Sequence, residues 1–449
     1  MPGPPNASNW ASLMSRPLAG LMPGIIDTHI HQWDPFTTPR ETSRLAPIYR
    51  VAPWLVDRLL PVLADRGSRE MVITPEHVGR PFLPATYAAD VAGVAEAVGV
   101  PVEGVMHVEA GWHRDDKSEE TAWVQGLPFG RAGAPPLIGM VASADPRSAD
   151  FADVLDRHAA ASDRFVGIRT LTGFHPDPKV KRWIEREGVL RDPDFLTGFA
   201  TLAERGLTFD AYVYSHQLSD ISVLASEYPE TTIVIDHDAT PVGWLGAMGA
   251  GTGRTDAERA EMFEHWRDAI AAVAAHPNVV SKQSGYAFPM LGLKTRGIGR
   301  AELAETVAPM VDHAVDVFGP DRLMCGSNFP MDKSLVAYPD LVGALADILA
   351  PRGPDLLRKT FRDNALRLYD WSPVDLHRCQ VPRPARARRG VAGHHPSVHR
   401  GDPGRAGVPL VRLVQEPRRP PRVRPGGGVR RRGGRWGTRR VGSLQDGAG

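Results

Sequence analysis

Short apolar runs rich in β-branched residues alternate with longer amphipathic stretches between residues 22 and 370. The amphipathic stretches have the period of helices that are buried on one face, and the short runs have the length of buried strands. The predicted strands lie at 25–30, 102–108, 137–142, 165–170, 208–214, 231–236, 279–284 and 322–326. The predicted helices lie at 150–161, 194–204, 217–227, 257–274, 301–318, 338–349 and 355–369. This alternation predicts repeated strand–helix units in an α/β fold.

Eight strand–helix units in about 350 residues favour a (β/α)8 barrel of the TIM type. The long connection between the first two predicted strands contains a further strand-like piece at 70–74, which we interpret as part of an insertion. A doubly wound sheet is the competing architecture, but no Gly-rich phosphate loop follows an early strand. We therefore expect a distorted barrel with an insertion after its first strand.

The formal net charge of +1 averages two segments of opposite charge. Residues 371–449 contain 18 arginines and four acidic residues, for a net charge of +14. Residues 1–370 contain 35 basic and 48 acidic residues, for a net charge of −13. The 14 glycines and 10 prolines after residue 370 interrupt helices and strands, so we expect a disordered tail there. The expected organisation is an extension at 1–21, a barrel at 22–370 and this tail.

The Arg- and Gly-rich tail suits binding to RNA or to acidic partners through charge neutralisation. A disordered extension, or a shifted reading frame through GC-rich DNA, explains the same composition without a function. We favour these two explanations and expect no nucleic-acid partner.

Cysteine content and hydropathy bound the location of the protein. The two cysteines, Cys325 and Cys379, cannot form a disulfide scaffold, so we expect a reducing, cytoplasmic location. No run of about 18 apolar residues is present, which argues against a membrane-spanning helix. Residues 1–21 lack the basic and apolar regions of a secretory signal.

Candidate chemistry begins at the end of the first predicted strand, which reads Ile-Ile-Asp-Thr-His-Ile-His from residue 25. His29 and His31 are two residues apart, so their side chains point to the same face of a strand. Barrel enzymes carry their catalytic groups at such C-terminal strand ends. Two adjacent imidazoles suit a divalent metal or a substrate carboxylate, and the alternative is a pair of hydrogen-bonded polar residues.

Further polar residues lie at other predicted strand ends and would converge on the same face of the barrel. They are His107, Glu109, Arg169, His216, His237 and Lys282. Each alone has a structural explanation, because a buried histidine is often only hydrogen-bonded and a basic side chain often reaches solvent. Their shared placement favours one functional site.

The eighth predicted strand is followed by Gly-Ser-Asn-Phe-Pro-Met-Asp from residue 326, which ends the strand in a tight turn. Asn328 would lie at the barrel mouth, where an amide orients a water or a carbonyl but cannot act as a general base. Asp332 would supply a carboxylate to the site if the turn folds back, or would cap the following helix.

These motifs resemble those of the amidohydrolase superfamily. The resemblance is narrower to the lactonase-like, metal-dependent hydrolases that include 2-pyrone-4,6-dicarboxylate lactonase and the sugar-acid lactonases. The matching motifs are Ile26-Asp27-Thr28-His29-Ile30-His31, Gly167-Ile168-Arg169, Ile235-Asp236-His237, Lys282-Gln283-Ser284-Gly285 and Gly326-Ser327-Asn328-Phe329-Pro330. They occur in the family's order and cover roughly residues 22–370.

The resemblance implies a distorted (β/α)8 barrel that hydrolyses a cyclic ester. His29 and His31 would be ligands of a metal or a substrate, and His237 would be the imidazole of the sixth strand. Arg169 would hold an anionic group of the substrate, because its planar fork suits a carboxylate. His216 would line the site from the fifth strand.

The resemblance covers both metal-dependent and metal-independent hydrolases. A divalent ion, zinc or manganese, would be held by His29, His31 and His237. Glu109 could complete this set, because oxygen ligands suit either metal.

In the family, the residue after the eighth strand is typically an aspartate that activates water, and Asn328 stands at that position here. We hypothesise that water attacks the ring carbonyl of a small, carboxylate-bearing lactone, and that Asp332 or His237 accepts a proton. The residues that would contact the substrate are Arg169, His216, Lys282 and Glu109. Two alternatives are a non-oxidative decarboxylase on the same barrel and a ligand-binding barrel that Asn328 has left without catalysis.

Overall fold

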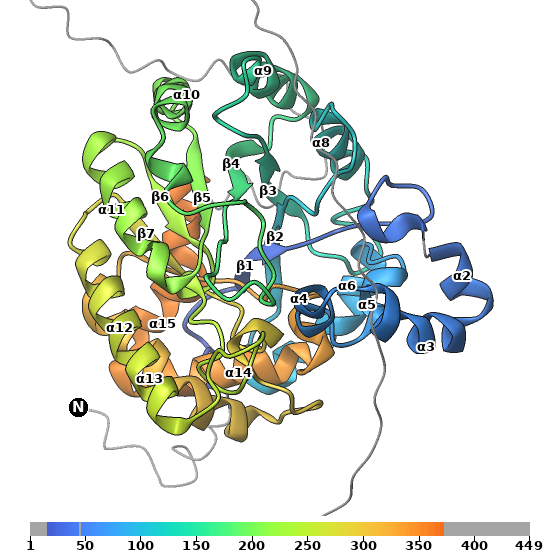
Figure 1. The fold of residues 1–449 in the computed structure, drawn as a ribbon. Helices are drawn as coiled ribbons and strands as arrows, with labels where there is room; N and C mark the ends of the chain where they lie inside the picture. Colours follow the sequence, from blue (N-terminus) through green and yellow to red (C-terminus); the bar gives the residue numbers. More distant parts are fainter. Residues whose placement is uncertain (1–15, 45, 372–449) are drawn as a thin grey trace, which may run out of the picture. The chain divides into compact units, whose positions relative to one another are not determined.

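The structure is a computed structural model that describes residues 16–44 and 46–371, so the tail predicted after residue 370 lies outside the described residues except for Trp371. Eight parallel strands form one sheet in which each strand pairs with the next along the chain (Figure 1). The strands are β1 (Ile25–Ile30), β2 (Val102–Val108), β3 (Leu137–Ser143), β4 (Phe165–Leu171), β5 (Thr208–Tyr212), β6 (Ile233–Ile235), β7 (Val279–Gln283) and β8 (Leu323–Cys325). A parallel bridge from Ile30 to Phe329 links β1 to the segment after β8. The predicted barrel is therefore confirmed.

Helices alternate with the strands, as the apolar periodicity predicts. They are α8 (Ser118–Gln125), α9 (Phe151–Ala161), α10 (Pro193–Glu204), α11 (Leu218–Glu227), α12 (Asp256–Ala274), α13 (Arg300–Phe318), α14 (Tyr338–Leu349), α15 (Pro354–Arg358) and α16 (Asn364–Leu368). A capping box begins α12, because Thr255 Oγ1 accepts from Glu258 N at 3.2 Å and the Glu258 carboxylate accepts from Thr255 N at 3.2 Å. The predicted closing helix is divided by a π-helical segment at Lys359–Asp363. Within the described part of the chain, none of the helices has the length and hydropathy needed to span a membrane.

The connection from β1 to β2 is a helical insertion, which Figure 1 shows gathered on one side of the strands. Its helices are η1 (Glu41–Arg44), α2 (Ala46–Val51), α3 (Pro53–Leu63), α4 (Arg66–Met71), α5 (Pro75–Gly79), α6 (Pro84–Val91) and α7 (Val94–Val98). The prediction of a strand-like piece at 70–74 is wrong, because Glu70 and Met71 end α4. The Asp65 carboxylate begins that helix by accepting from Ser68 N at 3.0 Å.

Apolar side chains fill the interior of the barrel in one cluster. Its strand residues are Ile26, Met106, Val108, Ile138, Val141, Val166, Val234, Val280 and Met324. Leu366 and Tyr369 belong to the same cluster, so the C-terminal helix packs against one end of the barrel interior. The polar residues of the predicted site therefore lie toward the opposite, C-terminal ends of the strands.

An irregularity in β1 aims its first histidine inward. The pairing of β1 with β2 shifts register between Asp27 and Ile30. Strict alternation from the inward Ile26 would turn His29 away from the barrel interior. The shift instead brings the His29 ring to 4.6 Å from the ring of His237, which follows β6.

Candidate active site

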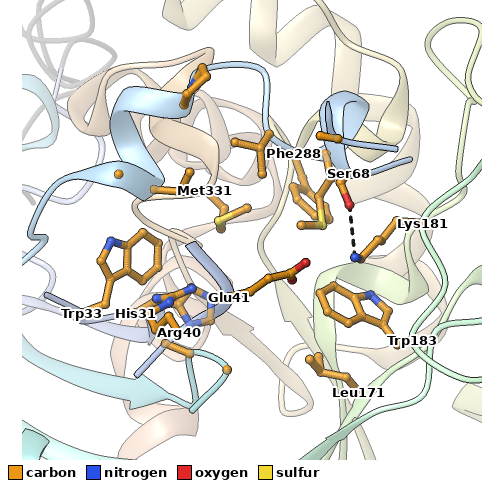
Figure 2. A pocket seen from close by; sticks show the side chains of 18 of the residues that line it. His31, Trp33, Arg40, Glu41, Ser68, Leu171, Lys181, Trp183, Phe288 and Met331 are labelled. Atoms are coloured by element: carbon orange, nitrogen blue, oxygen red, sulfur yellow. Dashed lines mark hydrogen bonds between the residues drawn. The ribbon is translucent and has the colours of Figure 1, made fainter. Parts of the chain in front are cut away.

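A cavity of about 390 Å³ lies at the C-terminal ends of the strands, and this size suits a small molecule. The strand ends contribute His31, Glu109, Arg169, Leu171, Tyr212, His237 and Asn328. The β1–β2 insertion contributes much of the facing wall, including Trp33, Arg40, Glu41, Tyr49, Ser68 and Met71 (Figure 2). Five of the ten residues singled out in the sequence therefore line one cavity, and the other five lie outside its lining. Those five are His29, His107, His216, Lys282 and Asp332.

Arg169 is held between two buried carboxylates. Its Nε and Nη2 donate to Glu109 Oε1 at 2.9 and 2.7 Å, and its Nη1 donates to Asp236 Oδ2 at 3.1 Å. Nη2 also donates to the backbone oxygen of Glu109 at 2.9 Å. Although burial opposes the charge, both carboxylates hold the pKa of Arg169 above its ordinary value. The guanidinium therefore brings positive charge to the cavity wall, but each of its nitrogens is already bonded to a protein oxygen.

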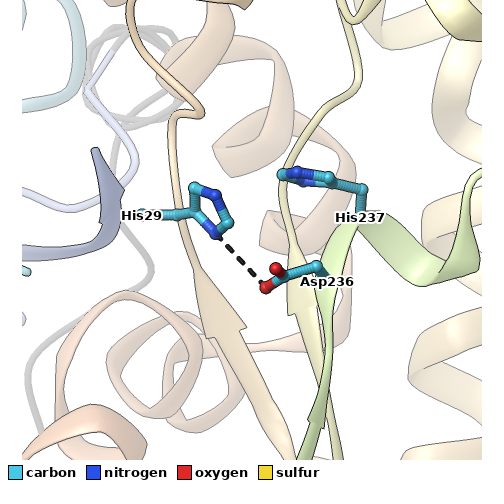
Figure 3. A group of neighbouring side chains, drawn as sticks. All are labelled: His29, Asp236 and His237. Atoms are coloured by element: carbon cyan, nitrogen blue, oxygen red, sulfur yellow. Dashed lines mark ion pairs between the residues drawn. The ribbon is translucent and has the colours of Figure 1, made fainter. Parts of the chain in front are cut away.

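His29, Asp236 and His237 form a buried group, of which His237 lines the cavity (Figure 3). One potential ligand atom from each lies within 4.8 Å of the others. His29 Nδ1 lies 3.3 Å from Asp236 Oδ1. His237 has a left-handed backbone, with φ of 55°, and its Nδ1 lies 2.8 Å from Ser284 Oγ. Burial lowers the pKa of His237 to about 4 and that of His29 well below its ordinary value, so both imidazoles are neutral at neutral pH.

The same group fits one divalent ion. Asp236 Oδ1 is buried and makes no hydrogen bond among the described residues; its neighbours His29 Nδ1 and Lys282 Nζ lie at ion-pair distances of 3.3 and 3.4 Å. Neutral imidazole is the metal-binding form of histidine, and two histidines with one carboxylate suit zinc. His31 lies outside this set, because its Nδ1 is 2.9 Å from Val108 O and its Nε2 is 3.3 Å from Asn328 Oδ1. In the structure Asp236 therefore takes the place that the sequence motifs suggest for His31.

Lys282 is fully buried beneath the histidines rather than on the cavity wall. Its Nζ is paired with Asp210 and lies 3.4 Å from Asp236 Oδ1 and 3.5 Å from His29 Nδ1. Burial raises the pKa of Asp210 to about 6 despite this cation. The pKa of Asp236 is well below its ordinary value, because Lys282 and its other cationic neighbours outweigh its burial. This placement puts Lys282 outside the cavity lining, where it compensates buried negative charge, and its expected contact with substrate stays a prediction.

Asn328 and Asp332 form a buried hydrogen-bonded chain with His31. Asn328 Nδ2 donates to Asp332 Oδ1 at 2.7 Å, and Ala287 N donates to Asp332 Oδ2 at 3.0 Å. The turn therefore folds back, and the Asp332 carboxylate faces Asn328 rather than capping the following helix. Burial raises the pKa of Asp332 to about 8. Asp332 lies behind Asn328, so it can reach the cavity only through that amide.

The fifth strand contributes a tyrosine instead of the expected histidine. β5 ends at Tyr212, which lines the cavity, and the chain then turns through a 3-10 helix at Ser215–Gln217. This turn leaves His216 exposed and outside the cavity lining. His107 is buried with Nε2 at 3.4 Å from Glu120 Oε1, also outside the main cavity.

Two cation–tryptophan pairs in the cavity wall were not predicted. The Arg40 guanidinium carbon lies 4.0 Å from the Trp33 ring centroid, and Lys181 Nζ lies 5.0 Å from that of Trp183 (Figure 2). No local pattern marks these residues, since they lie in connections whose path depends on the whole fold. Asp236 was also not predicted as a member of the His29–Asp236–His237 group, although its place before the histidine of the Ile-Asp-His motif is a signal for it.

The amidohydrolase family model matches residues 26–371. Uncharacterized protein y4mH of Sinorhizobium fredii is 29% identical over 347 residues, which cover 77% of this chain and 98% of that protein. An L-fucono-1,5-lactonase of Burkholderia ambifaria is 30% identical over 214 residues, which cover 47% of this chain and 63% of that enzyme. An amidohydrolase of Burkholderia multivorans, solved with bound HEPES, has a TM-score of 0.55 at 21% identity and covers 78% of this chain and 100% of its own. A second crystal form of that protein, with bound zinc, has a TM-score of 0.53 at 22% identity over the same shares.

Proposed function

Because the chain belongs to the amidohydrolase family, we propose that it hydrolyses the ester bond of a small lactone in the cavity at the strand ends. The observation that carries this proposal is His237, a buried, neutral imidazole on the cavity wall that Ser284 holds in place. The L-fucono-1,5-lactonases among the relatives support a cyclic ester as the substrate class.

The hydrogen bonds around His237 select its proton-accepting nitrogen. Ser284 Oγ donates to Lys282 O at 3.5 Å, so its oxygen accepts the hydrogen on His237 Nδ1 at 2.8 Å. The other nitrogen, Nε2, is then unprotonated. It would accept a proton from the water that attacks the ring carbonyl and later return it to the leaving alkoxide.

The cavity wall would also stabilise the charge that develops on the carbonyl oxygen. Arg169 faces the cavity with its guanidinium fixed by Glu109 and Asp236, so its positive charge need not reorganise during the reaction. His31 and Asn328, which contact each other and line the same wall, would pack against the ester.

As an alternative role for the same group, His29, Asp236 and His237 would hold zinc or manganese, and the ion, in place of the His237 base, would polarise the carbonyl and lower the pKa of water. One nitrogen of His237 cannot be a metal ligand and a proton acceptor at the same time. Metal content measured on the purified protein therefore separates the two roles of His237.

We propose a cytoplasmic location and a small-molecule substrate. Cys325 is a buried free thiol, which is compatible with a reducing compartment. The cavity volume and the Arg169 charge favour a small polar ligand.

The test compares a histidine that lines the cavity with a histidine that lies outside its lining. We expect His237→Ala to lower kcat/KM on a lactone panel, including L-fucono-1,5-lactone, by roughly 100- to 10,000-fold. His216→Ala is the matched control, because His216 lies outside the cavity lining, and it should retain activity. Acid release measured in a pH-stat, alongside carbon dioxide release, separates hydrolysis from the decarboxylase alternative. Equal losses in both variants, or no lactone hydrolysed by the unaltered protein, would refute the proposal.

A further inference from the structure

Arg40 brings a buried guanidinium nitrogen to the cavity wall without a bonding partner. Its Nη1 has no hydrogen-bond acceptor in the described part of the chain. Other cations of the wall are engaged, since the Arg169 nitrogens donate to protein oxygens and Lys181 Nζ donates to Ser68 Oγ at 3.2 Å. A buried donor without a hydrogen bond is destabilising. A ligand that supplies an acceptor at this position would therefore gain binding free energy.

The stacking of Arg40 on Trp33 leaves the N–H edge of the guanidinium group available to a ligand. Its guanidinium carbon lies 4.0 Å from the Trp33 ring centroid, which fixes one face of the planar group. Stacked guanidinium groups keep their N–H bonds in their own plane, where a carboxylate can accept two of them in parallel. The His31 ring is also stacked near Trp33, with the two ring centroids 6.4 Å apart, and both Arg40 and His31 line the cavity.

We propose that Arg40 anchors a carboxylate of the substrate, so that the enzyme acts on lactones that carry a free carboxylate. This inference rests on the proposed lactone hydrolysis and narrows it. It also moves the anionic subsite from Arg169, whose donors already face Glu109 and Asp236, to a residue of the β1–β2 insertion. An anchored ligand would lie between the insertion and the strand ends, with its ring next to His31.

Two carboxylates near Arg40 bear on this proposal. Glu120 offers Arg40 a competing role, and Glu41 offers a control substitution. Glu120 Oε2 is buried and also lacks a hydrogen-bond partner among the described residues, so Arg40 has a second role available as the counterion of Glu120. A counterion affects folding and all ligands alike, whereas an anchor affects anionic ligands selectively. Glu41 lines the same cavity beside Arg40, and its negative charge opposes an anionic ligand (Figure 2).

Binding is measured by isothermal titration calorimetry with pyroglutamate, a lactam that resists hydrolysis and carries a carboxylate, and with its neutral carboxamide, pyroglutamide. The unaltered protein should prefer pyroglutamate. Arg40→Met should weaken pyroglutamate binding roughly 10- to 100-fold and leave pyroglutamide binding within about twofold. Glu41→Gln should tighten pyroglutamate binding by roughly two- to fivefold. Arg114→Met is the matched control, since Arg114 is an exposed arginine outside the cavity lining, and it should change neither.

Several results would overturn the inference. They are equal or undetectable binding of both probes by the unaltered protein, a parallel loss of both probes in Arg40→Met, and weaker pyroglutamate binding in Glu41→Gln. The Glu41 substitution keeps the test decisive if Arg40→Met fails to fold, because Glu41 is exposed.

Hydrolysis of γ-carboxy-γ-butyrolactone and of its carboxamide then separates the two proposals. If both lactones are hydrolysed equally well, lactone hydrolysis stands and the Arg40 anchor fails. If pyroglutamate binds through Arg40 but neither lactone is hydrolysed, the anionic subsite stands and the proposed function fails.

Discussion

The free energy of unfolding of the unaltered protein should fall as the pH rises because of Asp332, and Asp332→Asn should not show this part of the fall. Asp332 is fully buried, and burial raises its pKa from 3.8 to about 8. A shift of this size lowers the free energy of unfolding by at most about 6 kcal/mol, a limit that is reached when the carboxyl is fully ionised in the folded protein. Asparagine imitates the neutral carboxyl, because its Oδ1 can accept from Ala287 N and its Nδ2 can donate to Asn328 Oδ1 once that amide turns over.

The sign of this pH dependence of stability follows from the number of protons that the folded and unfolded states bind. Between the unfolded pKa near 4 and the folded pKa of about 8, folded Asp332 holds a proton that the unfolded chain has released. This side chain therefore stabilises the fold less as the pH rises through that window. From pH 5 to pH 7.5 the unaltered protein should lose about 3 kcal/mol relative to Asp332→Asn.

Urea unfolding at pH 5 and pH 7.5, followed by circular dichroism, measures this difference. With a urea dependence near 3 kcal/mol per molar, the midpoint of Asp332→Asn should rise relative to the unaltered protein by about 1 M between the two pH values. Asp115→Asn is the control, because Asp115 is an exposed aspartate, and it should follow the unaltered protein. Parallel pH profiles for Asp332→Asn and the unaltered protein would show that the buried carboxyl is ionised in the fold and would refute the reasoning.

Arg169→Met should destabilise the fold by about 3–5 kcal/mol in urea unfolding, because it leaves Glu109 and Asp236 buried without their shared cation; a loss below about 1 kcal/mol would contradict the ion network. If His29, Asp236 and His237 act as a metal site, elemental analysis should find about one zinc or manganese ion per chain. That ion should be lost in His29→Ala and kept in His31→Ala, whereas the opposite pattern would favour the ligand set suggested by the sequence motifs.

The barrel could be predicted because its signal repeats along the chain. Eight apolar runs and their helices agree on one architecture, so errors at single boundaries do not change it. The element boundaries that were predicted wrongly depend on local backbone conformation and helix capping, which the hydrophobic periodicity does not reveal. β6 stops at Ile235 because the backbone from His237 to Thr240 is left-handed, and the strand-like piece at 70–74 is helical at its start because Asp65 caps α4.

The site could be predicted only as far as strand ends bring residues together. The placement of His31, Arg169 and His237 on one cavity wall follows from that rule. The role of each residue depends on partners from other strands, and one sequence does not reveal them. Arg169 illustrates this, because Glu109 of the segment after β2 engages the fork that the sequence assigns to a substrate.

Asn328, the departure from the family's usual aspartate, fits the charges of the layer of side chains in and beneath the cavity wall. That layer already contains three buried carboxylates and two cations. They are Glu109, Asp210 and Asp236, with Arg169 and Lys282 as the cations. A carboxylate at residue 328 would add a fourth negative charge, and its oxygen would meet Asp332 Oδ1 where the Asn328 amide now donates at 2.7 Å. Such a contact is tolerated only with a shared proton. Because Asp236 supplies a carboxylate from the sixth strand, an amide after the eighth strand keeps this layer near charge balance, and the residue substitution and the His29–Asp236–His237 group belong to one arrangement.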